Sequence, residues 1–208
     1  MNDYITIKGV AEASLEEKKS VFIANISPVT NDDEAVAFIN SIRRKYPDAK
    51  HNVYAYMLRT GSVTRYSDDR EPQGSAGLPV LETIRKNSIT DTVIVVTRYF
   101  GGILLGTGGL ARAYSAAAKK AIDLAGVCRR ELYSEYEINC TYADYQKLVS
   151  LFVLCGVTVC DTVFSECVRL VISFPKEKED AVISSVTEQT YGRCIPNKTG
   201  EKYGYSEL

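Results

Sequence analysis

Residues 97–114 read TRYFGGILLGTGGLARAY. Five glycines fall within nine positions of this stretch, and an arginine stands near each end, Arg98 and Arg112. The β-branched residues of DTVIVVTRYF, which covers 91–100, are typical of a buried strand. GLARAYSAAAKKAIDLAG, residues 109–126, predicts a helix closed by its final glycine. The stretch therefore predicts a strand, a glycine loop and a helix in direct succession.

The glycine loop is a candidate anion site. The first N–H groups of a helix have no partner within the helix, the helix dipole favours an anion there, and glycine lets a ligand approach the backbone closely. The stretch matches neither GxGxxG nor GxxxxGK[ST], so a dinucleotide or nucleotide site is not predicted. The alternative is that the glycines only let the helix pack tightly on the strand. The candidate phosphate or nucleic-acid contacts here are Arg98, Gly101, Gly102, Gly108, Gly109 and Arg112.

A second loop, SDDREPQGSAGLP at 67–79, carries three carboxylates, Asp68, Asp69 and Glu71. It leads into the predicted helix GLPVLETIRKN, and its Gly74 and Ser75 are further candidate phosphate contacts. The carboxylates could hold a metal ion or act as a base, but they suit helix capping or pairing with a nearby arginine equally well. We favour the structural interpretation.

The only histidine, His51, begins a predicted strand and could join Asp68, Asp69 and Glu71 in an enzymatic cleft. No nucleophile–base pair is evident, so catalysis is the weaker hypothesis. No cofactor or metal site is predicted, since none of the cysteines forms a CxxC pair. Because Cys140, Cys155, Cys160 and Cys167 lie among apolar residues, we expect them to be small buried side chains in a reducing compartment.

Composition excludes several classes of protein. No apolar run is long enough for a membrane span and the first residues lack the pattern of a signal peptide, so a cytoplasmic protein with no membrane partner is expected. Residues 1–134 carry 18 basic and 15 acidic side chains, whereas residues 135–208 carry 7 and 11. A polyanion would therefore favour the first part, although this balance is far from that of a strongly basic nucleic-acid binder.

The order of elements predicts two α+β domains, 1–130 and 131–208. The first contains opening strands, a helix over 31–47, a hairpin over 52–67 and the segments described above. The second repeats strands and helices in the order βαββαβ, which is the ferredoxin-like arrangement, and ends in a strand with a loose tail.

Three blocks carry a family resemblance: HNVYAYMLR, DDREPQGSAGLP and VIVVTRYFGGILLGTGGLARAY. They closely resemble the signature blocks of the YigZ/IMPACT family, and the likeness extends over 15–125. The resemblance implies an N-terminal domain with the fold of the second domain of ribosomal small-subunit protein five. It also implies a ferredoxin-like C-terminal domain, as in bacterial members. The family usually has D-D-G-E-P where this chain has Arg70 in place of glycine, so Arg70 is strained if that position needs a positive φ.

Eukaryotic members of that family regulate translation, and nucleic-acid or ribosome binding is inferred for bacterial ones from their fold. The favoured hypothesis is therefore a non-enzymatic regulator that binds RNA, the ribosome or a translation factor through its N-terminal domain. Two alternatives stay open. One is a protein-interaction module acting on a translational regulator, and the other is a hydrolase or phosphate-handling enzyme.

Overall fold

Strand β6 (Thr92–Tyr99), which the opening stretch predicts, lies at the centre of a five-stranded antiparallel sheet. All but the last of its residues are buried, as its run of β-branched side chains indicates. In pairing order the sheet contains β2 (Ala11–Glu17), β3 (Ser20–Pro28), β6, β4 (His51–Met57) and β5 (Thr64–Ser67). The hairpin predicted over 52–67 is β4 and β5, joined by the short 3-10 helix η1 (Thr60–Ser62).

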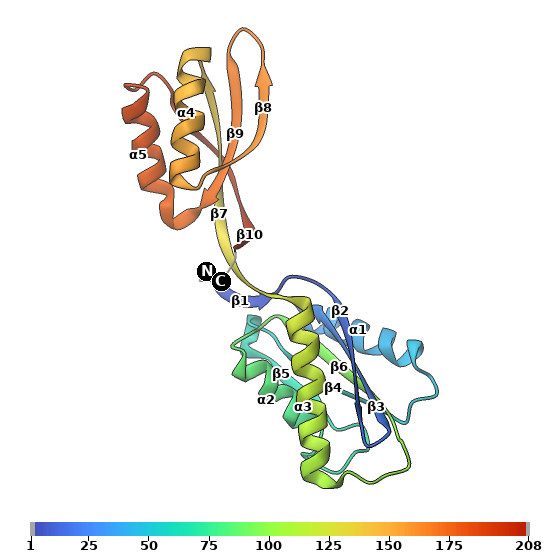
Figure 1. Cartoon of the computed structure of the whole chain (residues 1–208). Helices are drawn as coiled ribbons and strands as arrows, with labels where there is room; N and C mark the ends of the chain where they lie inside the picture. The colour runs from blue at the N-terminus through green and yellow to red at the C-terminus, as the bar shows by residue number, and fades with distance from the viewer. Residues whose placement is uncertain (1–2, 207–208) are drawn as a thin grey trace. The chain divides into compact units, whose positions relative to one another are not determined.

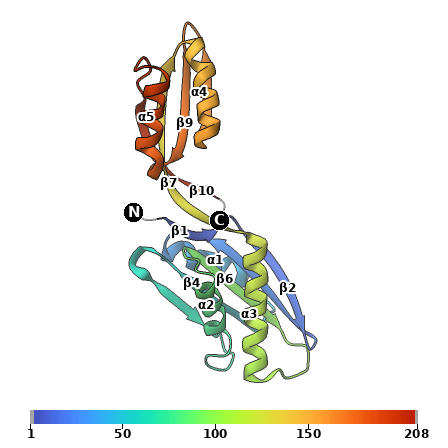
Figure 2. The ribbon, with the colours of Figure 1, turned by 60° about the vertical axis from the view of Figure 1, so that its left-hand side comes forward.

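Helices cover both faces of this sheet. The side chains of β6 alternate in direction, so its run of apolar residues places apolar side chains on both faces. Val93 and Val95 pack with α1 (Asp32–Lys45) in one apolar cluster. Ile94 and Val96 belong to the other cluster, together with buried residues of α2 (Gly77–Lys86) and α3 (Gly106–Ala125). Figures 1 and 2 show α2 and α3 on the face opposite α1.

The computed structural model describes residues 3–206, which divide into two compact units: Tyr4–Arg129 is the first, and Arg130–Ser206 together with Asp3 is the second. The second unit has the predicted βαββαβ order, with strands paired in the order β10-β7-β9-β8. Strand β1 (Tyr4–Ile7) lies in the first unit. The elements of the second unit are β7 (Val127–Cys140, from Arg130 onward), α4 (Tyr142–Cys155), β8 (Thr158–Phe164), β9 (Val168–Pro175), η2 (Lys176–Lys178), α5 (Glu179–Gln189) and β10 (Asn197–Ser206).

Apolar side chains of α4 and α5, among them Phe152 and Val186, form the second core with β7 and β9. The prediction of an α+β protein with a ferredoxin-like C-terminal domain is confirmed. The expected boundary after residue 130 differs by one residue from the division of the structure. The last two residues of the expected loose tail lie outside the described residues.

The expectation that the cysteines are buried is wrong for two of them. Cys140 is buried and Cys155 is half-buried, but Cys160 and Cys167 are exposed. Cys160 lies in β8, at the edge of the sheet, and Cys167 lies in the turn before β9, so the helices do not cover either thiol. All six cysteines are free thiols. Within residues 3–206, each helix is too short or too polar to span a lipid bilayer.

Candidate functional site

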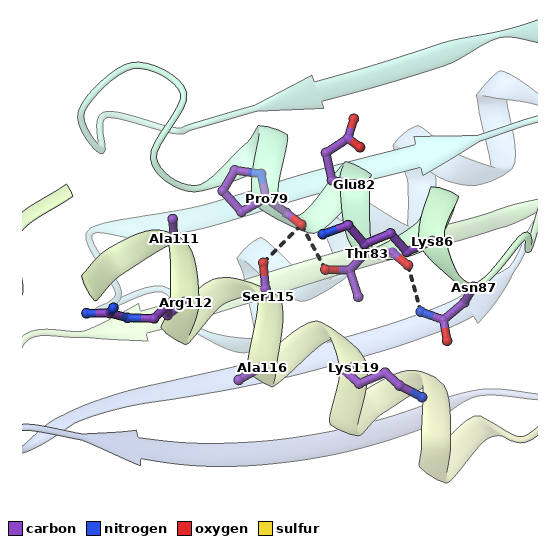
Figure 3. A pocket seen from close by; sticks show the side chains of 10 residues that line it. All are labelled: Pro79, Glu82, Thr83, Lys86, Asn87, Ala111, Arg112, Ser115, Ala116 and Lys119. Carbon is purple, nitrogen blue, oxygen red and sulfur yellow. Dashed lines mark hydrogen bonds between the residues drawn. The ribbon is translucent and has the colours of Figure 1, made fainter. Parts of the chain in front are cut away.

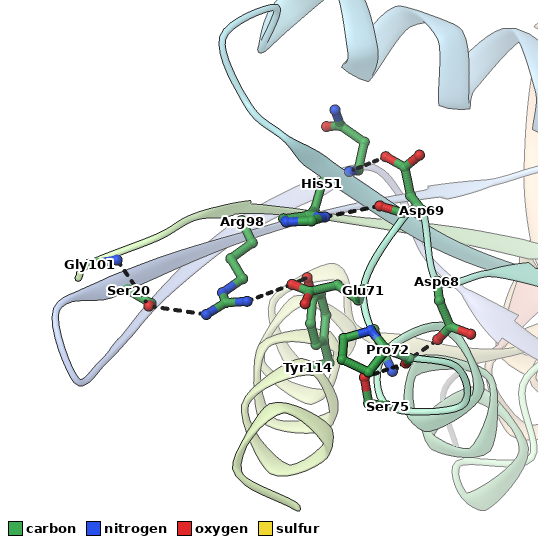
Figure 4. Close-up of polar contacts among 12 residues, drawn as sticks. Ser20, His51, Asp68, Asp69, Glu71, Pro72, Ser75, Arg98, Gly101 and Tyr114 are labelled. Carbon is green, nitrogen blue, oxygen red and sulfur yellow. Dashed lines mark hydrogen bonds and ion pairs between the residues drawn. The ribbon is translucent and has the colours of Figure 1, made fainter. Parts of the chain in front are cut away.

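The loop between β5 and α2 is closed around the carboxylate of Asp68. Its Oδ1 accepts hydrogen bonds from the N–H groups of Ala76 at 3.0 Å and Gly77 at 2.8 Å, and its Oδ2 accepts one from Gly74 at 2.9 Å. These amides include the first of α2, where a bound anion would be held. The side chain of Asp68 therefore takes the place of that anion (Figure 4).

The start of α2 is consequently not an open phosphate site. The prediction that Gly74 and Ser75 contact a phosphate is wrong. The N–H of Gly74 is bound to Asp68. Ser75 is 4% exposed, and its Oγ donates to the carbonyl oxygen of Pro72 at 2.6 Å.

Glu71 and Arg98 form a buried ion pair. Nη1 of Arg98 lies 2.7 Å from Oε1 of Glu71, and the two side chains are 6% and 4% exposed. The same Oε1 accepts a hydrogen bond of 2.9 Å from the hydroxyl of Tyr114 in α3. Burial, together with the charge of Glu71, raises the pKa of Tyr114 far above its usual value, so the hydroxyl stays a donor. The pair thus ties the loop to β6 and α3 (Figure 4).

The expectation that Arg98 meets a phosphate is therefore corrected as well. Its guanidinium points to Glu71, and Nη2 also lies 3.5 Å from Oγ of Ser20. A buried carboxylate without a partner is costly, so this arginine is needed inside the molecule. The alternative that a loop carboxylate pairs with an arginine describes the observed arrangement.

Asp69 and His51 hold the other side of the loop. The backbone N–H of Asn52 donates to Oδ2 of Asp69 at 2.7 Å, and Nδ1 of His51 lies 3.0 Å from the carbonyl oxygen of Asp69. Asp69 and Arg70 have φ values of 39° and 72°. Arg70 is thus in the left-handed region, where the resemblance placed a glycine, and the predicted strain is present.

The four residues of the enzymatic alternative, His51, Asp68, Asp69 and Glu71, do lie around one loop (Figure 4). Each carboxylate, however, is bound by backbone N–H groups or by the buried arginine. Such groups are poorly placed to take a proton from a substrate. Among residues 3–206, no three His, Cys, Asp or Glu side chains are placed to hold a metal ion.

The glycine loop packs on the turn between β2 and β3. A Cβ at Gly101 would lie 1.9 Å from the carbonyl carbon of Lys19, and the N–H of Gly101 donates to Oγ of Ser20 at 3.1 Å. Only glycine permits this approach. Gly102 and Gly106 have φ values of 85° and 68°, which favour glycine for a different reason. The packing alternative therefore explains part of the glycine content.

The start of α3 is open, in contrast to that of α2. Its N-cap residue, Leu105, has an apolar side chain that cannot accept a hydrogen bond from the helix amides. A Cβ at Gly108 would meet nothing within 4 Å, and this glycine has no positive φ. Glycine within a helix costs about 1 kcal/mol relative to alanine. Packing and backbone conformation therefore do not account for Gly108.

Arg112 is exposed beside this helix start and lines two grooves. One groove, of about 260 Å³, also contains Lys18 and Gly109. The other, of about 770 Å³, lies between α2 and α3 and contains Lys86 and Lys119 (Figure 3). Lys119 pairs with Asp123. Within the described chain, Arg112 and Lys86 form no ion pair, so both cations face solvent.

Sequence reasoning missed that Lys18 and Lys86 each line a groove together with Arg112. Lys18 lies in a hairpin turn and Lys86 at the end of α2, so both are distant in sequence from the glycine loop. No local motif connects them. The sequence signal available was only the excess of basic residues in the first domain.

Comparison with known proteins agrees with this architecture. Residues 18–122 match the Impact N-terminal domain, and residues 138–193 match a domain of unknown function, DUF1949. IMPACT family member YvyE of Bacillus subtilis is 40% identical over 146 residues, which are 70% of this chain and 66% of that protein. IMPACT family member YigZ of Escherichia coli is 32% identical over 166 residues, 78% of this chain and 81% of its own.

A solved structure described as a hypothetical protein has a TM-score of 0.61 and 28% identity, and the match covers 94% of this chain and 97% of that one. The fold and these matches define a two-domain protein with an Impact N-terminal domain followed by a DUF1949 domain. The chain belongs to the IMPACT family.

Proposed function

We propose that this protein is a non-enzymatic regulator that binds RNA of the translation machinery, with RNA phosphates at the start of α3. Membership of the IMPACT family supports a regulator of this kind. The observation that carries the proposal is the contrast between two helix starts. Asp68 fills the start of α2, whereas the start of α3 is uncapped and lies beside the exposed Arg112.

The binding surface comprises the first amides of α3 and the cations of its two grooves. Amides and arginine both suit phosphate oxygens, and neither carries base information. Because the exposed cations are few and dispersed, we expect moderate affinity with a modest salt dependence. The enzymatic alternative has less support, since the carboxylates of its cleft are occupied.

A second candidate function is binding to a protein regulator of translation. The observation that favours this function is the exposure of two apolar side chains of the glycine loop, since Ile103 is 42% and Leu104 is 83% exposed. Exposed apolar side chains at a loop tip are suited to a protein partner. Sedimentation of native extract on a sucrose gradient separates the two functions, since RNase would release the protein from ribosomal particles only if RNA holds it there.

The direct test is binding of a single-stranded RNA over a range of salt concentrations. Each contacted phosphate contributes about −0.7 to the log–log slope, and we expect a slope of about −2 to −4. Arg112→Ala should make this slope shallower by the contribution of roughly one phosphate contact or less. The change should be the same for RNAs of unrelated sequence. Lys147→Ala, an exposed lysine of α4 in the second unit, is the control. If no RNA binds at low salt, the RNA proposal fails and binding to a protein regulator of translation becomes the favoured function.

Gly108→Glu provides a second test, because its effects on stability and on binding have opposite signs. Replacing a helical glycine and adding an acidic side chain to the first turn should stabilise the fold by about 1 kcal/mol. The same carboxylate would repel a phosphate at the helix start and weaken RNA binding at least tenfold. Gly9→Glu, at an equally open glycine before β2, adds the same charge as a control. Equal binding by the two variants would contradict the proposed site.

A further inference from the structure

Three side chains of the first unit, Phe22, Arg98 and Phe100, form a cation–aromatic cluster that reaches the surface. The guanidinium carbon of Arg98 lies 5.5 Å from the ring centre of Phe22 and 5.6 Å from that of Phe100. Arg98 and Phe100 are two residues apart along the chain, and Phe22 is the register partner of Arg98 on β3. The cation therefore lies within cation–π distance of two aromatic rings.

The two inner side chains of this cluster, Phe22 and Arg98, are buried and fixed by further contacts. Phe22 is fully buried and meets the ring of Tyr114 edge-on at 5.1 Å. Arg98 is bound to Glu71 at 2.7 Å. Phe100, by contrast, is 55% exposed. An exposed aromatic ring is thus backed by a guanidinium that cannot turn away without breaking a buried ion pair.

The surface next to Phe100 carries cations, and one carboxylate, Glu17, lines the same groove as Lys18 and Arg112. The next residue, Gly101, packs against the Lys18-Lys19 turn, and both lysines are exposed. Lys18 shares a groove with Arg112. Proteins that bind single-stranded nucleic acids combine a cationic surface for the backbone with an aromatic ring on which a base stacks. The same two components occur together here.

We propose that the ring of Phe100 stacks on an unpaired base, so that the RNA bound at this surface is single-stranded. This inference rests on the proposed function and specifies the class of its ligand. A duplex would present its phosphates to Lys18 and Arg112, but its bases already stack on each other and cannot reach the ring. A base on Phe100 would lie against a ring that already contacts Arg98.

The first experiment compares a single-stranded RNA with a blunt duplex of the same sequence, at low salt, for wild-type protein and three variants. Phe100→Ala and Phe100→Leu should weaken single-strand binding about tenfold and leave duplex binding unchanged. Phe100→Tyr should bind the single-stranded RNA as well as wild-type protein does. Leucine keeps apolar bulk without a π-face, so it separates stacking from simple apolar contact. Circular dichroism melting checks that each variant folds.

The second experiment uses the absence of tryptophan from this chain. In Phe100→Trp the new side chain is the sole tryptophan, and stacking of a base should quench its fluorescence as oligouridine is added. Leu104→Trp, at a position 83% exposed in the same loop, is the matched control and should be quenched much less.

The outcomes separate this inference from the proposal on which it rests. If wild-type protein binds neither RNA, the proposed function fails and the stacking fails with it. If wild-type protein binds RNA but Phe100→Leu binds single strands as well as wild type, or if quenching is equal at positions 100 and 104, only the stacking is overturned.

Discussion

Nη1 of Arg98 lies 2.7 Å from Oε1 of Glu71 in the interior of the first unit, although the two residues are in different segments of the chain. This contact connects the loop before α2 to β6, the strand that precedes the glycine loop. It shows that an arginine and a carboxylate that look functional in the sequence can be structural partners. Under the proposed function, the ligand surface is the start of α3 and the side chains around it.

Arg98→Ala should destabilise the protein by about 3–5 kcal/mol, because it leaves the carboxylate of Glu71 buried without its cation. Urea denaturation measures the loss. The double variant Arg98→Met with Glu71→Gln removes both charges and should lose clearly less. If the single and double variants are equally destabilised, the ion pair is not what stabilises this loop.

Asp68→Ala should lower the free energy of unfolding by about 2 kcal/mol, the upper part of the range for losing an N-cap, because three N–H groups lose their acceptor. Asp68→Asn should lose about half as much, since its amide oxygen can still accept from Ala76 and Gly77. Thermal melting provides the comparison. Asp33→Ala, at an exposed carboxylate in the first turn of α1, should change stability much less.

Arg70→Gly should stabilise the protein by about 0.5–1 kcal/mol. It removes a left-handed strain of about 1–2 kcal/mol at a φ of 72°, against a smaller entropy cost of glycine in the unfolded chain. The arginine side chain is 79% exposed, so few contacts are lost. Arg70→Ala keeps the strain but removes the charge, and any gain in stability equal to that of glycine would contradict the conformational explanation.

Glu179 predicts a specific pH dependence. Hydrogen bonds from Tyr136, Ser134 and Lys198 lower the pKa of Glu179 from 4.5 to about 2. Because the folded pKa is below the unfolded one, this contribution to stability is present above about pH 4.5 and is lost as the pH falls toward 2. Glu179→Gln should flatten the curve of stability against pH in that window. Glu177→Gln, at an exposed carboxylate two residues earlier, should not.

The first unit should fold without the second. Each unit has its own apolar core, and the division at Arg129 and Arg130 agrees with the change in charge along the sequence. A fragment of residues 1–128 should be soluble and melt cooperatively by circular dichroism. An insoluble or unfolded fragment would show that the first unit depends on the rest of the chain.

The sequence by itself determined most of the fold. The β-branched run of 92–97, the Asn31 cap of α1 and the glycine after α3 are local signals, and the structure has a strand, a helix start and a helix end at these places. The same holds for the βαββαβ order of the second unit. Such signals are readable because backbone conformation and the periodicity of apolar residues depend on neighbours along the chain.

Only the tertiary structure decided which polar residues remain available for a ligand. Asp68 and Gly74 are close in sequence, but whether that carboxylate caps α2 or faces solvent depends on the path of the loop. Arg98 looked equivalent to Arg112 in the sequence, yet one is buried against Glu71 and the other is exposed. Burial and pairing arise between segments far apart along the chain, and electrostatics in the interior depends on those distances. For that reason the sequence alone could not separate the structural arginine from the one that faces solvent.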